Sequence, residues 1–198
     1  MTGPMKHIKT LCVYCGSNKG VDTHYASLAR DLGTEMAARG ISLVYGAGGI
    51  GLMTEVADAV LAGKGQVIGV IPDHLAHAEV QHGGLTETIV VDSMHHRKQI
   101  MFERADGFIV LPGGLGTLDE FFEILTWRQI GLHDKSVIVL DCADYWAPLQ
   151  ALVDQVVAQG FASPQAHDLY HKVNSVADVF AFLEKAPEPA VLGAPERF

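Results

Sequence analysis

The sequence is poor in cysteine, in positive charge and in long apolar segments. Its three cysteines are an odd number and do not suggest a disulfide framework. Only 14 lysines and arginines stand against 23 aspartates and glutamates, and the net charge of −9 argues against a basic surface for nucleic acid. No apolar run approaches the roughly 18 residues of a membrane span, and the short run 11–15 has no signal-peptide signature. We therefore expect a cytoplasmic protein, with neither a nucleic acid nor a membrane as partner.

Residue types that bind metals are present, but their spacing does not favour a metal site. Cys12 and Cys15 fall in an expected strand, where residues three apart point to opposite faces. His74 and His77 lack a third ligand at any usual spacing. We expect packed thiols, solvated or hydrogen-bonded histidines, and no bound metal.

Short apolar segments alternate with amphipathic ones along the chain. Strands are expected at 10–15, 41–45, 67–71, 88–91, 107–111 and 136–141. Helices are expected at 22–39, 52–62, 94–104, 118–130 and 144–159, with short helical segments and a brief strand in 163–185. This alternation predicts an α/β fold, a Rossmann-like parallel sheet with helices on both faces. One domain, 10–186, is expected between a flexible leader, 1–9, and a Pro-rich tail, 187–198.

The segment 112–120, Pro-Gly-Gly-Leu-Gly-Thr-Leu-Asp-Glu, joins an expected strand to an expected helix. Its three glycines let the backbone approach a ligand, and Thr117 is placed to cap a helix whose free N–H groups attract an anion. A phosphate is the expected ligand, and an ordinary tight turn is the alternative. The buried face of the helix is predicted from the spacing of Leu118, Phe121, Phe122 and Leu125. On that prediction Glu120 lies outside the buried face.

A second glycine-rich loop, 46–51, fits the dinucleotide pattern G-x-G-x-x-G between a strand and a helix. Asp73 even lies where a dinucleotide enzyme has its ribose-binding acid. The pattern usually occupies the first strand–helix unit, however, and here a complete unit precedes it. Three interpretations stay open: a mononucleotide or phosphate loop, which is favoured, a dinucleotide site, or close packing of helix against strand.

Two neighbouring cations, Arg97 and Lys98, lie on the expected helix 94–104. The buried stripe of that helix is predicted to contain Met94, Met101, Phe102 and Ala105. Lys98 falls inside this stripe and Arg97 on its border, so each needs an anionic partner or ligand unless it extends past the sheet to water. Because the carboxyl ends of parallel strands share one edge, Arg97, Lys98, Glu120 and the Gly46 loop are expected to meet there.

These motifs together carry a family resemblance. Met94-His95-x-Arg97-Lys98, followed by Pro-Gly-Gly-x-Gly-Thr-x-x-Glu at 112–120, closely resembles the Lonely Guy (LOG) family over about residues 11–165. Members of that family are cytokinin riboside 5′-monophosphate phosphoribohydrolases that often also act on AMP, and many were earlier labelled lysine decarboxylases. The resemblance implies hydrolysis of the N-glycosidic bond of nucleoside 5′-monophosphates to free base and ribose 5-phosphate, with no cofactor. It also implies a homodimer.

The resemblance assigns roles to individual residues. Arg97 and Glu120 match the family's catalytic pair. The positions that match substrate contacts are Glu79, Lys98, Gly113, Gly114, Gly116, Thr117, Asp119 and Thr126. The loop pattern adds Gly46, Gly48 and Gly49 as substrate-binding candidates. Asp119 departs from the family, since many members have a glutamate there, and its shorter side chain has less reach toward a ribose.

The expected chemistry fits these roles. Glycoside hydrolysis passes through a cationic sugar, so Glu120 is expected to stabilise that charge or align water. Arg97 is expected to orient substrate or stabilise the leaving side, while the Gly113 loop with Thr117 holds the phosphate. Three rivals remain: a pyridoxal-phosphate decarboxylase using Lys98, an NAD-dependent oxidoreductase using the Gly46 loop, and a non-catalytic nucleotide carrier.

Overall fold

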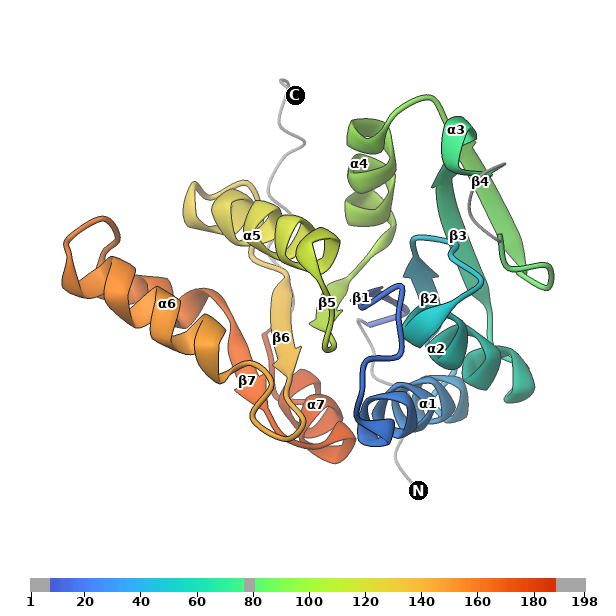
Figure 1. Ribbon diagram of the computed structural model, residues 1–198, viewed down its shortest axis with the longest axis horizontal. Helices are drawn as coiled ribbons and strands as arrows, with labels where there is room; N and C mark the ends of the chain where they lie inside the picture. Colours follow the sequence, from blue (N-terminus) through green and yellow to red (C-terminus); the bar gives the residue numbers. More distant parts are fainter. Residues whose placement is uncertain (1–7, 77–80, 188–198) are drawn as a thin grey trace.

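The computed structural model describes residues 8–76 and 81–187, and its centre is a 7-stranded sheet in the order β4-β3-β2-β1-β5-β6-β7 (Figure 1). The strand pairings of the described residues are all parallel. The strands are β1 (Thr10–Tyr14), β2 (Ser42–Tyr45), β3 (Val67–Pro72), β4 (Glu87–Val91), β5 (Gly107–Val110), β6 (Ser136–Leu140) and β7 (His171–Val173). The expected parallel sheet in one domain is confirmed.

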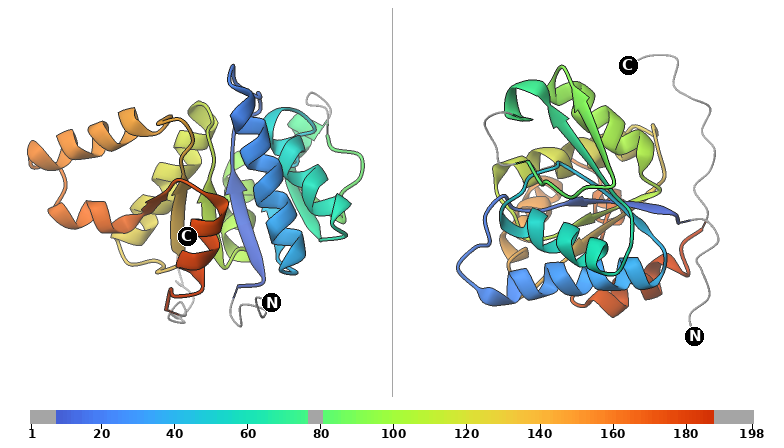
Figure 2. Two further views of the ribbon diagram at one scale, coloured as in Figure 1. Left: turned by 90° about the horizontal axis from the view of Figure 1, so that it is seen from below. Right: turned by 90° about the vertical axis from the view of Figure 1, so that its right-hand side faces the viewer.

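Helices cover both faces of the sheet (Figure 2). They are α1 (Thr23–Ala38), α2 (Gly51–Ala62), α3 (Asp73–Ala76), α4 (Met94–Arg104), α5 (Leu115–Gln129), α6 (Ala147–Ala158), the 3₁₀ helix η1 (Pro164–Leu169) and α7 (Val176–Leu183). One apolar core contains residues of α1, α2 and α7, and a second contains residues of α4, α5 and α6. Because both faces are covered, a central strand such as β5 is buried along its whole length, which explains its unbroken apolar sequence. No helix in the described parts of the chain is long and apolar enough to cross a membrane.

The chain reverses its direction across the sheet between β1 and β5. The first four strands follow one another from β1 at the centre of the sheet to β4 at one edge. Helix α4 then connects β4 to β5, which pairs with the other side of β1. From there β6 and β7 extend the sheet the other way. In doubly wound sheets ligands bind at this reversal, beyond the carboxyl ends of the strands. The topology therefore locates the expected site before any side chain is considered.

Two helices differ in how they begin. Ser93 caps α4, because its hydroxyl accepts a hydrogen bond from the backbone N–H of His96. The prediction that Asp144 opens the next helix is wrong, since α6 begins at Ala147. Asp144 and Ala143 instead have positive φ angles of 57° and 54°, which form a left-handed turn rather than a helix. Between β3 and β4 the chain forms α3, which no expected helix covers, while His77 and the site candidate Glu79 lie outside the described residues.

Candidate active site

The buried face of α5 is rotated by one residue from the predicted one. Its buried residues are Thr117, Glu120, Phe121, Ile124 and Leu125, spaced i, i+3, i+4, i+7 and i+8. Phe122 is 38% exposed and Glu120 is 8% exposed, so the expectation that Glu120 lies off the buried face is wrong. The helix also begins at Leu115 with Gly114 at its N-cap, so Thr117 lies in the first turn and is not the cap. The polar members of the buried stripe thus occupy the first turns of α5, where they face a pocket instead of the core.

Glu120 faces Arg97 across that pocket. The Nη2 atom of Arg97 lies 3.5 Å from Oε1 of Glu120, and both side chains are nearly buried. The guanidinium is held by its Nε atom, which donates to the carbonyl oxygen of Val70 in β3 at 3.2 Å. A Cβ atom at Gly46 would lie 1.8 Å from Arg97 Nη2, so the absence of a side chain there makes room for the guanidinium. The predicted meeting of Arg97, Glu120 and the Gly46 loop is confirmed.

The protonation of Glu120 is set mainly by its burial. Loss of water around the carboxyl raises its pKa from 4.5 to about 7. Arg97 and Lys98 oppose this rise through their positive charges, whereas Asp119 and Glu123 add to it. Glu120 therefore titrates near neutral pH, where one group can both accept and release a proton.

Lys98 has two carboxylate partners on α5. Its Nζ atom lies 3.2 Å from Asp119 Oδ2 and 3.0 Å from Glu123 Oε1. Burial lowers the pKa of Lys98, but the hydrogen bonds to Glu123 and Asp119 outweigh it, and the pKa is raised above its usual value. Asp119 and Glu123 are thus the anionic partners that the sequence predicted for Lys98. They also disfavour a Schiff-base role, which needs a neutral amine.

The pocket around Arg97 and Glu120 has a volume of about 230 Å³ at the carboxyl end of the sheet. Its lining residues are Val13, Cys15, Ser17, Gly46, Met53, Pro72, Leu75, Met94, Arg97, Gly114, Leu115, Gly116, Thr117 and Glu120. The lining combines polar groups, which are the catalytic candidates and the start of α5, with the apolar side chains of Met53, Leu75 and Met94. A lining that contains both an anion-attracting helix start and apolar side chains suits a nucleotide, whose phosphate is charged and whose base is largely apolar.

Other predicted site residues lie elsewhere in the described chain. Lys98 and Asp119 pair with each other beside the pocket, outside the set of residues that lines it. Thr126 lies nine residues along α5 from Thr117, about 14 Å by the rise of an α-helix, and its hydroxyl donates to the carbonyl oxygen of Phe122. Thr126 lines a separate groove between α5 and α6. Within one chain, Thr126 is thus outside the described lining of the pocket that contains Glu120.

The glycines of the 46–51 loop make room for neighbouring groups, which are side chains at Gly46 and Gly48 and backbone at Gly51. Cβ atoms at Gly48 and Gly51 would lie 2.3 Å from Met53 Cε and 2.2 Å from the carbonyl carbon of Ser17, and Gly51 has a φ of +68°. Gly48 and Gly49 are outside the described lining of the pocket. The close-packing interpretation therefore explains this pattern best, with Gly46 making room for Arg97. The favoured phosphate-loop and the dinucleotide interpretations receive no support from this placement.

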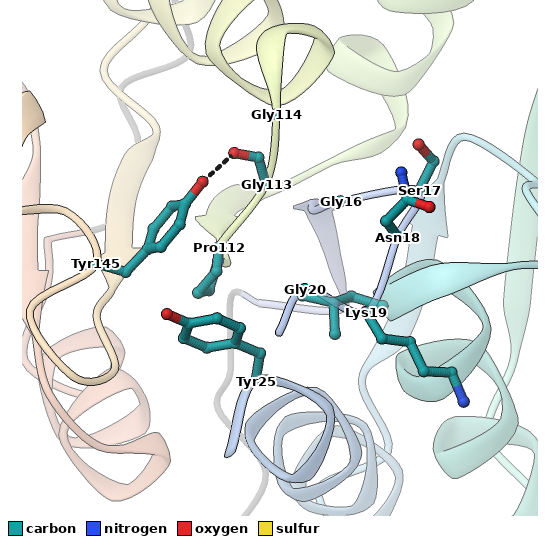
Figure 3. Close-up of a pocket in the computed structure, with 11 residues that line it drawn as sticks. Gly16, Ser17, Asn18, Lys19, Gly20, Tyr25, Pro112, Gly113, Gly114 and Tyr145 are labelled. Atoms are coloured by element: carbon teal, nitrogen blue, oxygen red, sulfur yellow. Dashed lines mark hydrogen bonds between the residues drawn. The ribbon is translucent and has the colours of Figure 1, made fainter. Parts of the chain in front are cut away.

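A second cavity of about 220 Å³ adjoins the first, with Ser17 and Gly114 lining both (Figure 3). Its other lining residues are Gly16, Asn18, Lys19, Gly20, Tyr25, Leu52, Pro112, Gly113 and Tyr145. The polar turn 16–18 after β1 lines the second cavity, and its Ser17 lines both. The sequence did not predict a role for Tyr25 or Tyr145, because neither belongs to a recognisable motif. Only the approach of α1 and the β6–α6 loop to the reversal point brings these rings together.

Comparison with known proteins agrees with this geometry. A family model described as possible lysine decarboxylase matches residues 53–183. The cytokinin riboside 5′-monophosphate phosphoribohydrolase LOG1 of Arabidopsis thaliana is 43% identical over 176 residues, covering 89% of this chain and 83% of that protein. A cytokinin riboside 5′-monophosphate phosphoribohydrolase of Rhodococcoides fascians is 44% identical over 157 residues, covering 79% of each chain. The chain belongs to the LOG family.

Several solved structures share this fold at low sequence identity. A molybdenum cofactor binding protein from Rippkaea orientalis superposes with a TM-score of 0.68 at 20% identity, covering 90% of this chain and 97% of that one. A molybdenum cofactor carrier protein from Chlamydomonas reinhardtii gives a TM-score of 0.67 at 18% identity, covering 90% and 97%. At such identity these similarities show the fold alone. The function of this LOG-family chain must be argued from its site.

Proposed function

We propose that this LOG-family chain hydrolyses the N-glycosidic bond of nucleoside 5′-monophosphates, including cytokinin riboside 5′-monophosphates and AMP. The products are the free base and ribose 5-phosphate. The observation that carries the proposal is the buried pair of Glu120 and Arg97 beside the start of α5. The names of the relatives support the same reaction.

The phosphate is proposed to bind at the start of α5. The first N–H groups of a helix have no partner within it, and here they belong to Leu115, Gly116 and Thr117, which line the pocket. Cβ atoms at Gly114 and Gly116 would meet nothing within 4 Å, so this wall is open to an incoming group. Binding the phosphate here supplies energy that holds the sugar against Glu120.

The reaction proposed at Glu120 breaks the bond between C1′ of the ribose and the base nitrogen. The oxygen of a water molecule forms a bond to C1′ and keeps one of its protons. The other proton ends on the base nitrogen, so that the base leaves as a neutral molecule. The carboxylate of Glu120 stabilises the cationic sugar and accepts the proton of the water, and its pKa of about 7 allows it to release that proton again. Arg97 is proposed to orient the substrate and stabilise the leaving side. No metal is included in this scheme, and within the described residues no three His, Cys, Asp or Glu side chains group to hold one.

A carrier function is disfavoured by the same observation. Keeping a carboxyl buried until its pKa approaches 7 costs folding free energy, and such costs are typical of catalytic groups. A protein that only binds a nucleotide has no use for a buried carboxyl that lowers its stability in this way.

The direct test measures release of free base and ribose 5-phosphate from AMP and from N⁶-isopentenyl-AMP. We expect both products in equal amounts from at least one of these substrates, and loss of release in Arg97→Ala. The matched control is Arg104→Ala, which removes a cation at the exposed end of the same helix. Absence of base release from both nucleotides by the unmodified protein would refute the proposal.

We also propose that the protein acts in the cytoplasm as a homodimer. The groove between α5 and α6, which contains Thr126, is lined by apolar side chains that include Phe122 and Leu152, both exposed in the single chain. A second copy covering this face would bury them, and it would give Thr126 a route to the substrate of its partner. Light scattering at micromolar concentration should give the mass of two chains, and Phe122→Asp should give the mass of one. A monomer mass for the unmodified protein would overturn the assembly.

A further inference from the structure

The loop that precedes α5 is held by three carbonyl oxygens in succession. Gly16 N–H donates to the oxygen of Pro112 at 3.0 Å, and Leu118 N–H donates to the oxygen of Gly114 at 3.1 Å. Between them, the hydroxyl of Tyr145 donates to the oxygen of Gly113 at 2.6 Å (Figure 3). The first two bonds come from the backbone. The third comes from a side chain 32 residues away in the chain, which lines the second cavity together with Gly113.

The bond from Tyr145 decides which way one peptide group faces. In a trans peptide the C=O and the N–H point in opposite directions, and the described residues contain no cis peptide. With the Gly113 oxygen turned toward Tyr145, the N–H of Gly114 therefore points to the other side. Tyr145 and Gly113 line the second cavity and are outside the described lining of the pocket of Arg97 and Glu120, whereas Gly114 lines both. The N–H of Gly114, which points away from Tyr145, is therefore assigned to the side of the catalytic pocket.

This peptide group is especially free to turn over if nothing holds it. Both residues that flank it are glycines, whose backbone angles are the least restricted. A reversed peptide would direct the Gly113 oxygen, a negative dipole end, at the place proposed for the phosphate. A hydrogen bond to this oxygen selects the orientation that attracts an anion.

Tyr145 is itself held firmly. It follows Ala143 and Asp144, whose left-handed φ angles are uncommon for residues with side chains and mark a constrained turn. The buried Asp141 fixes this turn by accepting hydrogen bonds from the N–H groups of Cys142 and Trp146. The ring of Tyr145 packs edge-on against Tyr25, with centroids 5.5 Å apart.

We propose that Tyr145 is a positioning residue for phosphate binding, holding the Gly113–Gly114 peptide so that the N–H of Gly114 faces the substrate. The inference rests on the proposed nucleotide hydrolysis, but it concerns the phosphate end alone. Tyr145 acts through the loop and does not touch the reacting atoms.

The test is Tyr145→Phe, which keeps the ring and removes the hydroxyl. We expect the KM for AMP to rise roughly tenfold with kcat little changed, as loss of one oriented hydrogen bond predicts. The dissociation constant of ribose 5-phosphate, measured by calorimetry, should rise by the same factor, while that of adenine should not change. The matched control is Tyr25→Phe, because the Tyr25 hydroxyl has no hydrogen-bond partner within the described residues and its ring lines the same cavity.

The outcomes separate this inference from the proposed function. Unchanged ribose 5-phosphate binding in Tyr145→Phe, or equal weakening of adenine and ribose 5-phosphate, would overturn the role of Tyr145 even if AMP is hydrolysed. Weakened ribose 5-phosphate binding would support it even if base release failed in the unmodified protein. Absence of any ribose 5-phosphate binding by the unmodified protein would overturn it as well.

Discussion

Replacing Glu120 by glutamine should make the protein less active and, above neutral pH, more stable. Glutamine keeps the shape of the side chain and removes its negative charge. Base release from AMP should fall roughly a thousandfold, the usual scale for loss of a charged catalytic group, while AMP still binds. The gain in stability follows from the burial of the carboxyl, which the rotated face of α5 imposes.

The size of the gain follows from the pKa of Glu120. Each pKa unit corresponds to about 1.4 kcal/mol, so the rise from 4.5 to about 7 corresponds to about 3 kcal/mol. Below pH 4.5 the carboxyl of Glu120 is protonated in both the folded and the unfolded protein, and the folded protein keeps its full stability. This part of the stability is lost as the pH rises through 7. At pH 8 the native state must bury the charge, and unfolding relieves it. Glutamine carries no such charge, so Glu120→Gln should be about 3 kcal/mol more stable than the unmodified protein at pH 8.

Denaturant unfolding at pH 8 and pH 4.5 measures this difference. The two proteins should differ by about 3 kcal/mol at pH 8, which is about 6 to 12 °C in melting temperature for a chain of this size, and by little at pH 4.5. Glu103→Gln is the matched control, because Glu103 is exposed on α4 and its replacement should change stability by less than about 0.5 kcal/mol at either pH. Equal stability of Glu120→Gln and the unmodified protein at both pH values would refute the burial argument. Near-normal base release would refute the catalytic assignment.

Three further predictions concern the same pocket. The kcat/KM for AMP should rise with pH through an apparent pKa of about 7, because Glu120 must be ionised to accept a proton, and a flat profile from pH 5.5 to 8.5 would contradict this role. Gly46→Ala should lower kcat/KM at least tenfold, since the new methyl group would displace Arg97, whereas Gly83→Ala meets no atom within 4 Å and should have no effect in the same assay. Adenosine should be hydrolysed with a kcat/KM at least about a hundredfold below that of AMP, because it lacks the phosphate held at α5, and equal turnover would contradict phosphate anchoring.

The order of strands and helices could be predicted from the sequence because it depends on local patterns. Apolar runs bounded by glycine and proline marked the strands, and the alternation with helices required a parallel sheet. The meeting of Arg97 with Glu120 also followed, since the carboxyl ends of parallel strands share one edge. Misassigned helix starts, as at Asp144, arose where a side chain able to cap a helix instead lies in a left-handed turn.

The sequence by itself thus determined the fold, the polar loops at one sheet edge and the pair of residues proposed for catalysis. Only the tertiary structure decided which face of α5 is buried, because several residues of that helix are apolar and its rotation depends on the packing of the sheet beneath it. That rotation buries Glu120 and raises its pKa. Packing between distant segments also decided that Gly46 makes room for Arg97 and that Tyr145 reaches the Gly113 carbonyl. Such contacts join residues far apart in the chain, so no local sequence pattern predicts them.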